Sequence, residues 1–185
     1  METKRRCFIA LDLSKAVINE IRGIQKKIEK ENIKKNLFMG KFTKPENLHL
    51  TLKFLGEINE EKISKVKEKL DEIKFKSFDS EISKIGVFSK KFIKIIWIKL
   101  ENVGKLQKNI DDKLKNFFDS EYRFMGHITI VRVKNVFNKQ ELINCLNKIK
   151  IEKIKFTINS FVLKESELNS EGPVCKDIEK YNLES

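Results

Sequence analysis

The sequence is poor in the residues that mark several classes of protein. It has two prolines in 185 residues, and with 40% hydrophobic residues this argues against a disordered chain. Its three cysteines, Cys7, Cys145 and Cys175, form no CxxC pair and are odd in number, which argues against a zinc site or a disulfide framework. No apolar run approaches the ~18 residues that a membrane span needs. We therefore expect a folded, reduced, cytoplasmic protein without a membrane segment.

Histidine is also scarce, and its positions are informative. The chain has two histidines and five threonines, and each histidine is followed two places later by a threonine. The two segments are His49-Leu50-Thr51-Leu52 and His127-Ile128-Thr129-Ile130. In both, histidine and threonine alternate with aliphatic residues. On a strand the two polar side chains therefore share one face, and the aliphatic side chains point into a core.

Two such faces at one point suit phosphodiester chemistry. Imidazole titrates near neutral pH, so one histidine can take a proton from an incoming oxygen while the other donates one to a leaving oxygen. The two threonine hydroxyls can hold the non-bridging oxygens, and no metal or cofactor is expected. A single His-x-Thr on a strand is more often structural. Two copies in a chain without other histidines make His49, Thr51, His127 and Thr129 the candidate catalytic residues.

Positive charge is what the chain has in excess. It contains 39 basic and 27 acidic residues, which gives a net charge of +12. Such a surface attracts polyanions, of which nucleic acid is the usual one. Lysine-rich composition is also typical of thermophilic proteins. The charge therefore supports an RNA partner but does not establish one.

The periodicity of apolar residues predicts an α+β chain. Helices are expected at 14–31, 59–73, 103–118 and 138–149, and strands at 6–13, 48–55, 75–87, 92–100, 127–133, 156–163 and 174–181, with a loop at 168–173. Each His-Thr strand is followed by a helix. This repeated order predicts a duplication in pseudo-twofold arrangement, with two antiparallel sheets and outer helices. We expect residues 1–185 to form a single two-lobed domain without a linker.

Two longer segments carry a resemblance to a known family. They are Asn47-Leu48-His49-Leu50-Thr51-Leu52-Lys53-Phe54-Leu55-Gly56 and Gly126-His127-Ile128-Thr129-Ile130-Val131-Arg132. They resemble the paired signature motifs of the two-histidine phosphoesterases, and most of all the RNA 2′,3′-cyclic phosphodiesterases, historically called 2′-5′ RNA ligases. The likeness extends to Arg6-Cys7-Phe8-Ile9-Ala10-Leu11, Lys44-Pro45-Glu46, Gly86-Val87-Phe88 and Ile96-Trp97. It implies a bilobal α+β fold with the active site in a central cleft between the lobes.

The same resemblance implies an activity. The expected reaction is metal-independent opening of a 2′,3′-cyclic phosphate at an RNA end to a 2′-phosphate, with 2′-5′ ligation as its reverse. By analogy His49 is the general acid and His127 the general base, although the residues themselves do not assign the roles. One alternative is a two-histidine phosphodiesterase for another substrate, such as a cyclic nucleotide or 2′-5′ oligoadenylate. Another is a non-catalytic RNA-binding module. We expect a monomer.

Two charged residues near the motifs are candidates for substrate binding. Lys53 lies four places after His49 and shares its face in a regular strand; the alternative is a surface lysine. Arg132 lies five places after His127 and falls on the opposite face of a regular strand, although a bulge or bend can turn it toward the cleft. The family often has an arginine at this position, and a guanidinium suits a phosphate or a base edge.

Aromatic side chains are candidates for stacking on an unpaired base. The family pattern points to Phe8 and Phe42, together with Phe88 and Trp97. Phe42 stands where the family often has a tryptophan, a difference in a packing or stacking surface and not in the chemistry. Because the chain has 14 phenylalanines, the alternative for each is a place in the core.

Overall fold

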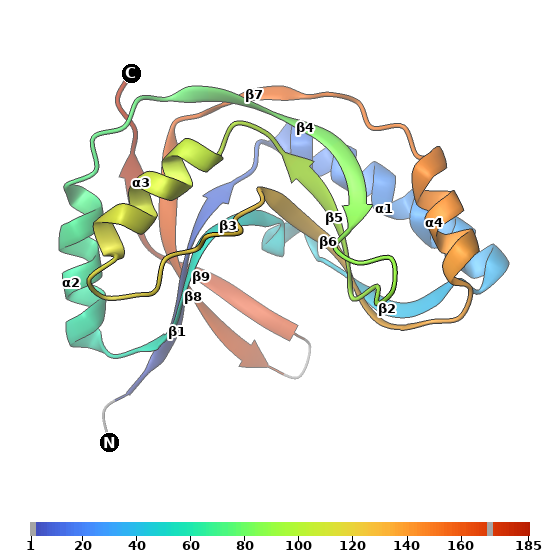
Figure 1. Ribbon diagram of the computed structural model, residues 1–185, viewed down its shortest axis with the longest axis horizontal. Coiled ribbons are helices and arrows are strands. Elements are labelled where there is room, and N and C mark those ends of the chain that lie inside the picture. The colour runs from blue at the N-terminus through green and yellow to red at the C-terminus, as the bar shows by residue number, and fades with distance from the viewer. Residues whose placement is uncertain (1–2, 170–171) are drawn as a thin grey trace.

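The computed structural model describes residues 3–169 and 172–185. Its elements in chain order are β1 (Arg5–Asp12), α1 (Lys15–Lys35), β2 (Phe38–Phe42), the 3-10 helix η1 (Pro45–Asn47), β3 (His49–Ile58), α2 (Glu60–Asp71), β4 (Phe78–Val87), β5 (Ile95–Leu100), α3 (Gly104–Leu114), β6 (His127–Val136), α4 (Lys139–Lys148), β7 (Lys155–Ile158), β8 (Ser160–Asn169) and β9 (Gly172–Asn182). The predicted α+β class is confirmed (Figure 1).

Polar side chains begin three of the helices. Ser14, Asn59 and Asn138 each accept a hydrogen bond from a backbone N–H in the first turn, and so satisfy a donor that the helix leaves free. All three starts agree with the sequence prediction. α3 has no such cap and ends at Leu114, so it is shorter than predicted. The residues after it form the segment that leads to His127.

The strands form one antiparallel, curled sheet in the order β7-β4-β5-β6-β3-β1-β8-β9, with β2 added beside β6. We call β3, β1, β8 and β9 the first half of the sheet, and β6, β5, β4, β7 and β2 the second half. The two halves are joined where Leu50 pairs with Ile128. The prediction of two separate sheets therefore needs this correction: the two signature strands pair with each other at their His-Thr segments and make the sheet continuous.

The chain order repeats, as predicted. If the short elements β2, η1 and β7 are set aside, the series β1-α1-β3-α2-β4 is followed by β5-α3-β6-α4-β8. The third strand of each series joins the other half, because β4 pairs with β5 and β8 pairs with β1. This exchange interlocks the two halves. It could not be read from the sequence, because strand order along the chain does not name the pairing partner.

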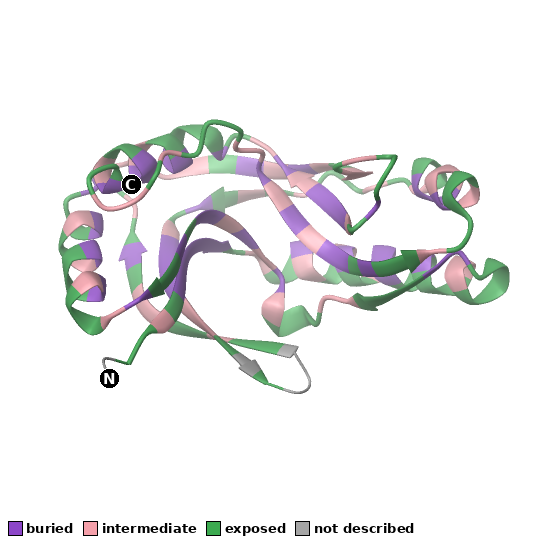
Figure 2. Cartoon of the chain, turned by 60° about the horizontal axis from the view of Figure 1, so that its bottom comes forward, coloured by how far each residue is buried: buried purple, intermediate pink, exposed green. Residues whose placement is uncertain are grey.

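The helices leave one face of the sheet open. α2 and α3 pack against each other and against β9 and β3, whereas α1 and α4 pack together beside the second half. Buried residues line the strands and the inner sides of the helices, and exposed residues cover the outer sides (Figure 2). The concave face of the sheet lies on the other side, where the hairpin of β8 and β9 projects (Figure 1).

The C-terminal hairpin is longer than predicted. β8 runs to Asn169 and β9 begins at Gly172, so most of the predicted loop at 168–173 is strand; positions 170 and 171 lie outside the described residues. Among the described residues, no helix is long and apolar enough to cross a membrane.

Candidate active site

A cleft of about 990 Å³ lies on the concave face, where the two halves meet. Both halves contribute to its walls. The lining residues are Arg6, Cys7, Phe8, Lys41, Phe42, Thr43, Lys44, Glu46, Asn47, His49, Thr51, Phe54, Gly56, Ile95, His127, Thr129, Arg132, Ser166, Asn169, Pro173, Val174 and Cys175. All four candidate catalytic residues are among them, so the structure brings the two motifs together in one cleft.

The pairing of the two signature strands explains this convergence. Leu50 and Ile128 are partners at the centre of the contact, and both are fully buried. In an antiparallel pair, the residues on either side of the partners lie across from each other. His49 is therefore beside Thr129, and Thr51 is beside His127. With strands ~4.8 Å apart and alternate residues ~7 Å apart, the four side chains surround an area that suits a phosphate group.

A β-bulge follows each His-x-Thr segment. On β3, Thr51 pairs with Ala10 and Lys53 with Ile9, so Leu52 has no partner. On β6, Thr129 pairs with Trp97 and Val131 with Ile96, which leaves Ile130 without one. An extra residue shifts the alternation of side chains by one position. Beyond each bulge, the side chain five places after the histidine therefore faces the cleft.

The bulge corrects the prediction for Lys53. This lysine is 5% exposed and does not line the cleft. Its Nζ forms a buried ion pair with Asp111 of α3 and donates to the carbonyl oxygen of Asp119 at 2.7 Å. Lys53 thus faces the helix side of the sheet, where it ties β3 to the segment that leads to His127. Its place in the cleft was predicted from a regular strand, and the bulge makes that prediction wrong.

The bulges on β3 and β6 also turn Phe54 and Arg132 toward the cleft. Arg132 is exposed and lines the cleft, as the sequence analysis allowed for a bulged strand. Phe54 holds the corresponding place on β3 and is 71% exposed. Sequence reasoning missed Phe54, because a regular strand would place it on the core side. The cleft thus offers an aromatic ring from one signature strand and a guanidinium from the other.

The His49 ring lies against an aromatic side chain. Its ring stacks on Phe8 with centroids 5.0 Å apart and an angle of 30° between the planes. Burial lowers the pKa of His49 to about 4, and the nearby Lys164 ammonium acts in the same direction. Asp12 and a backbone hydrogen bond at Asn47 act against this shift. At neutral pH, the His49 imidazole is therefore uncharged in the free protein.

Lys164 belongs to a charge cluster behind His49. Its Nζ lies 2.9 Å from Asp12 and 2.5 Å from Asp177, and its side chain is largely buried. Although burial works against the ammonium, the hydrogen bonds to the two aspartates raise the pKa of Lys164. The lysine therefore stays protonated and keeps a fixed positive charge near the His49 ring.

His127 is held differently. Its Nδ1 lies 2.8 Å from the carbonyl oxygen of Met125, and a carbonyl can only accept, so Nδ1 carries a proton. Nε2 is then the nitrogen that exchanges protons. The edge of the ring meets Phe88 at 4.8 Å and 85°. Gly126 precedes the histidine where a Cβ would come 2.6 Å from the carbonyl oxygen of Leu100, so this close approach requires glycine.

The other predicted aromatic residues have mixed outcomes. Phe8 lines the cleft but is only 4% exposed, so it supports His49 and offers no open face to a base. Phe42 lines the cleft, half-buried, with Phe38 behind it at 6.2 Å. Trp97 is 6% exposed beneath Phe88 and does not line the cleft. Phe88 is 55% exposed at the side of His127.

The polar side chains that line the cleft include two imidazoles and the threonine hydroxyls beside them. In the part of the chain that the structure describes, no group of three or more histidine, cysteine, aspartate and glutamate side chains is placed to hold a metal ion. Cys7 is buried at the cleft wall, and burial raises the pKa of its thiol to about 11, so it is a poor nucleophile. An α+β sheet with two facing His-Thr pairs in its concave side defines the class of two-histidine phosphoesterases.

The chain belongs to the LigT-like phosphoesterase family, whose model matches residues 11–97 and 99–175. Two curated relatives, both named RNA 2′,3′-cyclic phosphodiesterase, are similar over part of the chain. The Archaeoglobus fulgidus protein is 32% identical over 50% of this chain and 50% of its own length, and the Thermotoga maritima protein is 35% identical over 52% and 51%. The alignments thus span about half of these relatives.

Solved structures show the same fold. A Thermus thermophilus protein superposes with a TM-score of 0.75 at 22% identity over 96% of this chain and 97% of that one. Escherichia coli LigT, solved in complex with 3′-AMP, superposes with a TM-score of 0.70 at 19% identity over 98% and 99%. At these identities the likeness establishes the fold, and function depends on the residues of the cleft.

Proposed function

We propose that this protein hydrolyses the 2′,3′-cyclic phosphate at an RNA end to a 2′-phosphate, through acid/base catalysis by His49 and His127. The observation that carries the proposal is the pairing of Leu50 with Ile128, which sets both His-Thr pairs side by side in one cleft. The names of the curated relatives support the choice of substrate. The family is that of phosphoesterases, and the particular reaction is our inference.

The proposed step balances without a cofactor. A water oxygen attacks phosphorus and gives its proton to one imidazole. The bond between phosphorus and the 3′ oxygen breaks, and the other imidazole protonates that oxygen. Thr51 and Thr129 would donate hydrogen bonds to the non-bridging oxygens, whose charge grows in the transition state. The same step, with a 5′-hydroxyl in place of water as the attacking group, would form a 2′-5′ phosphodiester and release the 3′ oxygen as a hydroxyl, which is 2′-5′ ligation.

Phe54 and Arg132 are suited to hold the terminal nucleoside. Phe54 offers an exposed ring on which a base can stack, and Arg132 offers a planar guanidinium for a base edge or a phosphate. They are on opposite signature strands, at the two sides of the four catalytic candidates. A nucleoside bound between them would keep its cyclic phosphate at the His-Thr pairs. Phe42 extends the apolar wall from β2.

The roles of the two histidines can be separated experimentally. Family analogy makes His49 the acid, whereas its pKa of about 4 favours it as the base, because a neutral imidazole accepts a proton. In a substrate with sulfur at the 3′ bridging position, the leaving group is a thiolate, which needs no proton from a general acid. The alanine variant that lacks the acid should therefore regain turnover with this substrate, and the variant that lacks the base should not. Recovery by His49→Ala supports the analogy; recovery by His127→Ala supports the reverse assignment.

We further propose that residues 1–185 act as one two-lobed domain, as a cytoplasmic monomer. The exchange of third strands between the halves supports a single unit, since neither half is built from one continuous series. The cysteines of the described residues are free thiols, which fits a reducing compartment. Size-exclusion chromatography with light scattering tests the monomer directly, and a dimer mass would contradict it.

The test of the activity is turnover of a short RNA with a 2′,3′-cyclic phosphate end, in EDTA, with products resolved as 2′- or 3′-phosphate. The proposal predicts a 2′-phosphate and no loss of rate in EDTA. Turnover of cyclic mononucleotides or 2′-5′ oligoadenylate in preference to RNA would transfer the mechanism to that substrate. Binding of RNA without turnover would contradict the proposed activity and indicate a non-catalytic RNA-binding module.

A further inference from the structure

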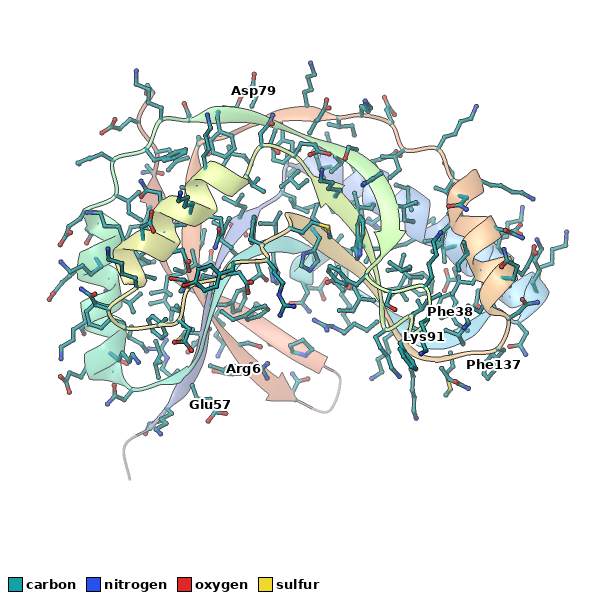
Figure 3. The ribbon with its side chains drawn as sticks, in the orientation of Figure 1. Arg6, Phe38, Glu57, Asp79, Lys91 and Phe137 are labelled. Atoms are coloured by element: carbon teal, nitrogen blue, oxygen red, sulfur yellow. The ribbon has the colours of Figure 1, made fainter. Side chains whose placement is uncertain are left out.

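The two halves of the sheet differ in charge. β1, β3, β8 and β9 contain six basic and six acidic residues. The strands of the second half contain six basic and two acidic residues, and both acidic ones, Asp79 and Glu81, are near the start of β4. Figure 3 shows Asp79 at the top of the view, away from Lys91 and the concave side. Among the strands, the excess of positive charge therefore lies in the second half of the sheet.

The segment 88–94, between β4 and β5, adds to this concentration. We call it the 88–94 turn; it contains Lys90, Lys91 and Lys94 and no acidic residue. All three lysines are exposed. Within residues 3–169 and 172–185, none of them forms an ion pair with a carboxylate, and Lys94 donates instead to the carbonyl oxygen of Lys134 at 3.4 Å. Three unneutralised ammonium groups are thus held together.

The 88–94 turn also presents aromatic side chains. Phe88 is 55% exposed and Phe92 is 66% exposed. Phe88 rests on Trp97 at 5.8 Å and meets the edge of His127 at 4.8 Å, so the turn begins at a catalytic candidate. The Nζ of Lys91 lies 5.5 Å from the Phe92 ring centroid. Exposed rings interleaved with cations are the usual platform for single-stranded nucleic acid.

A row of side chains connects the turn with the cleft. Lys41 of β2 pairs with Arg132 of β6, and Arg132 pairs with Ile95 of β5. Lys41, Arg132 and Ile95 all line the cleft. Val87 of β4 pairs with Ile96 of β5, so Phe88, the next residue, lies beside Ile95. Four neighbouring positions at ~4.8 Å spacing extend about 14 Å, enough for two nucleotides of an extended strand. This row leads from the catalytic centre across the second half to the turn.

We infer that the 88–94 turn binds the single-stranded body of the RNA substrate, on the 5′ side of its cyclic end. The inference rests on the proposed function. When the terminal phosphate of an RNA occupies the cleft, the rest of the RNA chain must extend out of the cleft across one of its walls. The strands of the first half carry equal numbers of basic and acidic residues, and Glu57 of β3 is the strand partner of Arg6 of β1 (Figure 3). The second-half wall supplies cations and stacking surfaces. The enzyme should therefore favour an RNA over a mononucleotide with the same cyclic end.

The first test compares these two substrates. The triple variant Lys90→Gln/Lys91→Gln/Lys94→Gln is measured with adenosine 2′,3′-cyclic phosphate and with a ten-nucleotide RNA that ends in the same group. We expect the ratio of kcat/KM for the RNA to that for the mononucleotide to fall roughly tenfold at 0.1 M salt. The matched control removes three exposed lysines from the outer side of α1, as Lys26→Gln/Lys27→Gln/Lys30→Gln. Its ratio should remain that of the wild type.

The outcomes separate the two proposals. An equal ratio in the triple variant and the control overturns the role of the turn, while turnover by the wild type still supports the proposed function. Anisotropy of a labelled ten-nucleotide RNA tests binding without turnover. The slope of log Kd against log salt should be about 2 shallower for the triple variant, because each phosphate contact on a single strand contributes ~0.7. An unchanged slope overturns the inference whatever the activity.

The aromatic part of the surface has its own test. Phe92→Ser should weaken binding of the RNA about tenfold or more, since stacking of one base contributes that much. Phe137→Ser, which removes a ring of similar exposure just after β6, is the control and should leave binding as in the wild type. A polyglutamate peptide that competes as well as unlabelled RNA would show that charge alone is recognised, and would overturn RNA as the partner.

Discussion

β3 and β6 carry the same short motif and differ in what surrounds it. Both have a histidine, a threonine and a bulge at the same spacing. After the bulge, β3 buries a lysine and exposes Phe54, whereas β6 buries Val131 and exposes Arg132. His49 stacks on a ring, and His127 meets one edge-on. The shared backbone geometry places both His-Thr pairs in the cleft. The side chains around them differ, so His49 and His127 have unequal surroundings.

This inequality has chemical consequences. A symmetric pair of histidines would not distinguish the attacking oxygen from the leaving oxygen. Here burial and Lys164 hold the pKa of His49 at about 4, which keeps that ring neutral before substrate binds. The aromatic ring of Phe54 on one side and the guanidinium of Arg132 on the other would fix which way a nucleoside enters. The difference between the strands would thus give the proposed reaction a direction.

Removal of either histidine is the largest expected effect. His49→Ala and His127→Ala should each lower kcat on the cyclic-phosphate RNA by roughly 10²–10⁴-fold, because each removes a proton carrier. Thermal unfolding of both variants shows whether the fold is kept. Thr43→Ala, at another position in the cleft wall, is the control. Near-normal turnover by either histidine variant would mean that only one strand carries the chemistry.

The next largest effect concerns Lys53, which follows the bulge on β3, and its contribution to the free energy of unfolding. Lys53→Met should lower the free energy of unfolding by about 3–5 kcal/mol, because it leaves Asp111 charged and buried without its partner. Urea denaturation measures this value. Val131→Met, at the matching position of β6, changes only apolar packing and should cost no more than about 3 kcal/mol. A Lys53 variant as stable as the wild type would show that the ion pair does not hold β3 to α3.

A smaller effect separates the two substrate-facing side chains. Phe54→Ala should raise KM about tenfold for an RNA that ends in a purine, through loss of stacking. Arg132→Lys keeps the charge but loses the planar fork, and should also raise KM, with less dependence on the terminal base. Steady-state kinetics with adenosine and uridine ends makes the comparison. If both variants respond alike to the change of base, the proposed division of roles is wrong.

The last prediction concerns the pH dependence of stability. A native pKa of about 4 for His49, against an ordinary value of 6.5, means that the unfolded chain binds more protons between these values. Stability should therefore be full above about pH 6.5 and fall as the pH drops toward 4. The loss attributable to His49 should be on the order of 3 kcal/mol. The His49→Gln variant should not show this loss of stability at low pH. NMR titration of the two histidines measures the pKa of His49 directly. A His49 signal that titrates near 6.5 would contradict the burial argument.

The sequence allowed the catalytic candidates to be found because histidine is rare and its spacing to threonine repeats. It did not reveal both bulges. On β6, Ile130 and Val131 are consecutive aliphatic residues, a break in alternation that signals the shift and brings Arg132 to the cleft. On β3 the matching pair is Leu52 and Lys53, and the lysine hides the same break. Lys53 was therefore placed in the cleft and Phe54 was missed.

The fold was predictable to a similar degree. Helix starts at Ser14, Asn59 and Asn138 follow from local hydrogen bonding, and the repeated order follows from periodicity. The exchange of β4 and β8 between the halves does not, because it depends on which strands pair at long range. The joining of the two halves at Leu50 and Ile128 has the same origin. Local signals were sufficient for most elements, although the predicted strand 156–163 is two strands, β7 and β8. They were insufficient for the pairing partners of the strands.

The central claim is that the two His-Thr pairs form one catalytic centre. The most direct measurement is the turnover of cyclic-phosphate RNA by His49→Ala, His127→Ala and the double variant. Residues that act as one unit are strongly non-additive, so the double variant should be about as slow as the slower single variant. Losses that multiply in the double variant, or a single variant that keeps its rate, would show two independent sites and contradict the account.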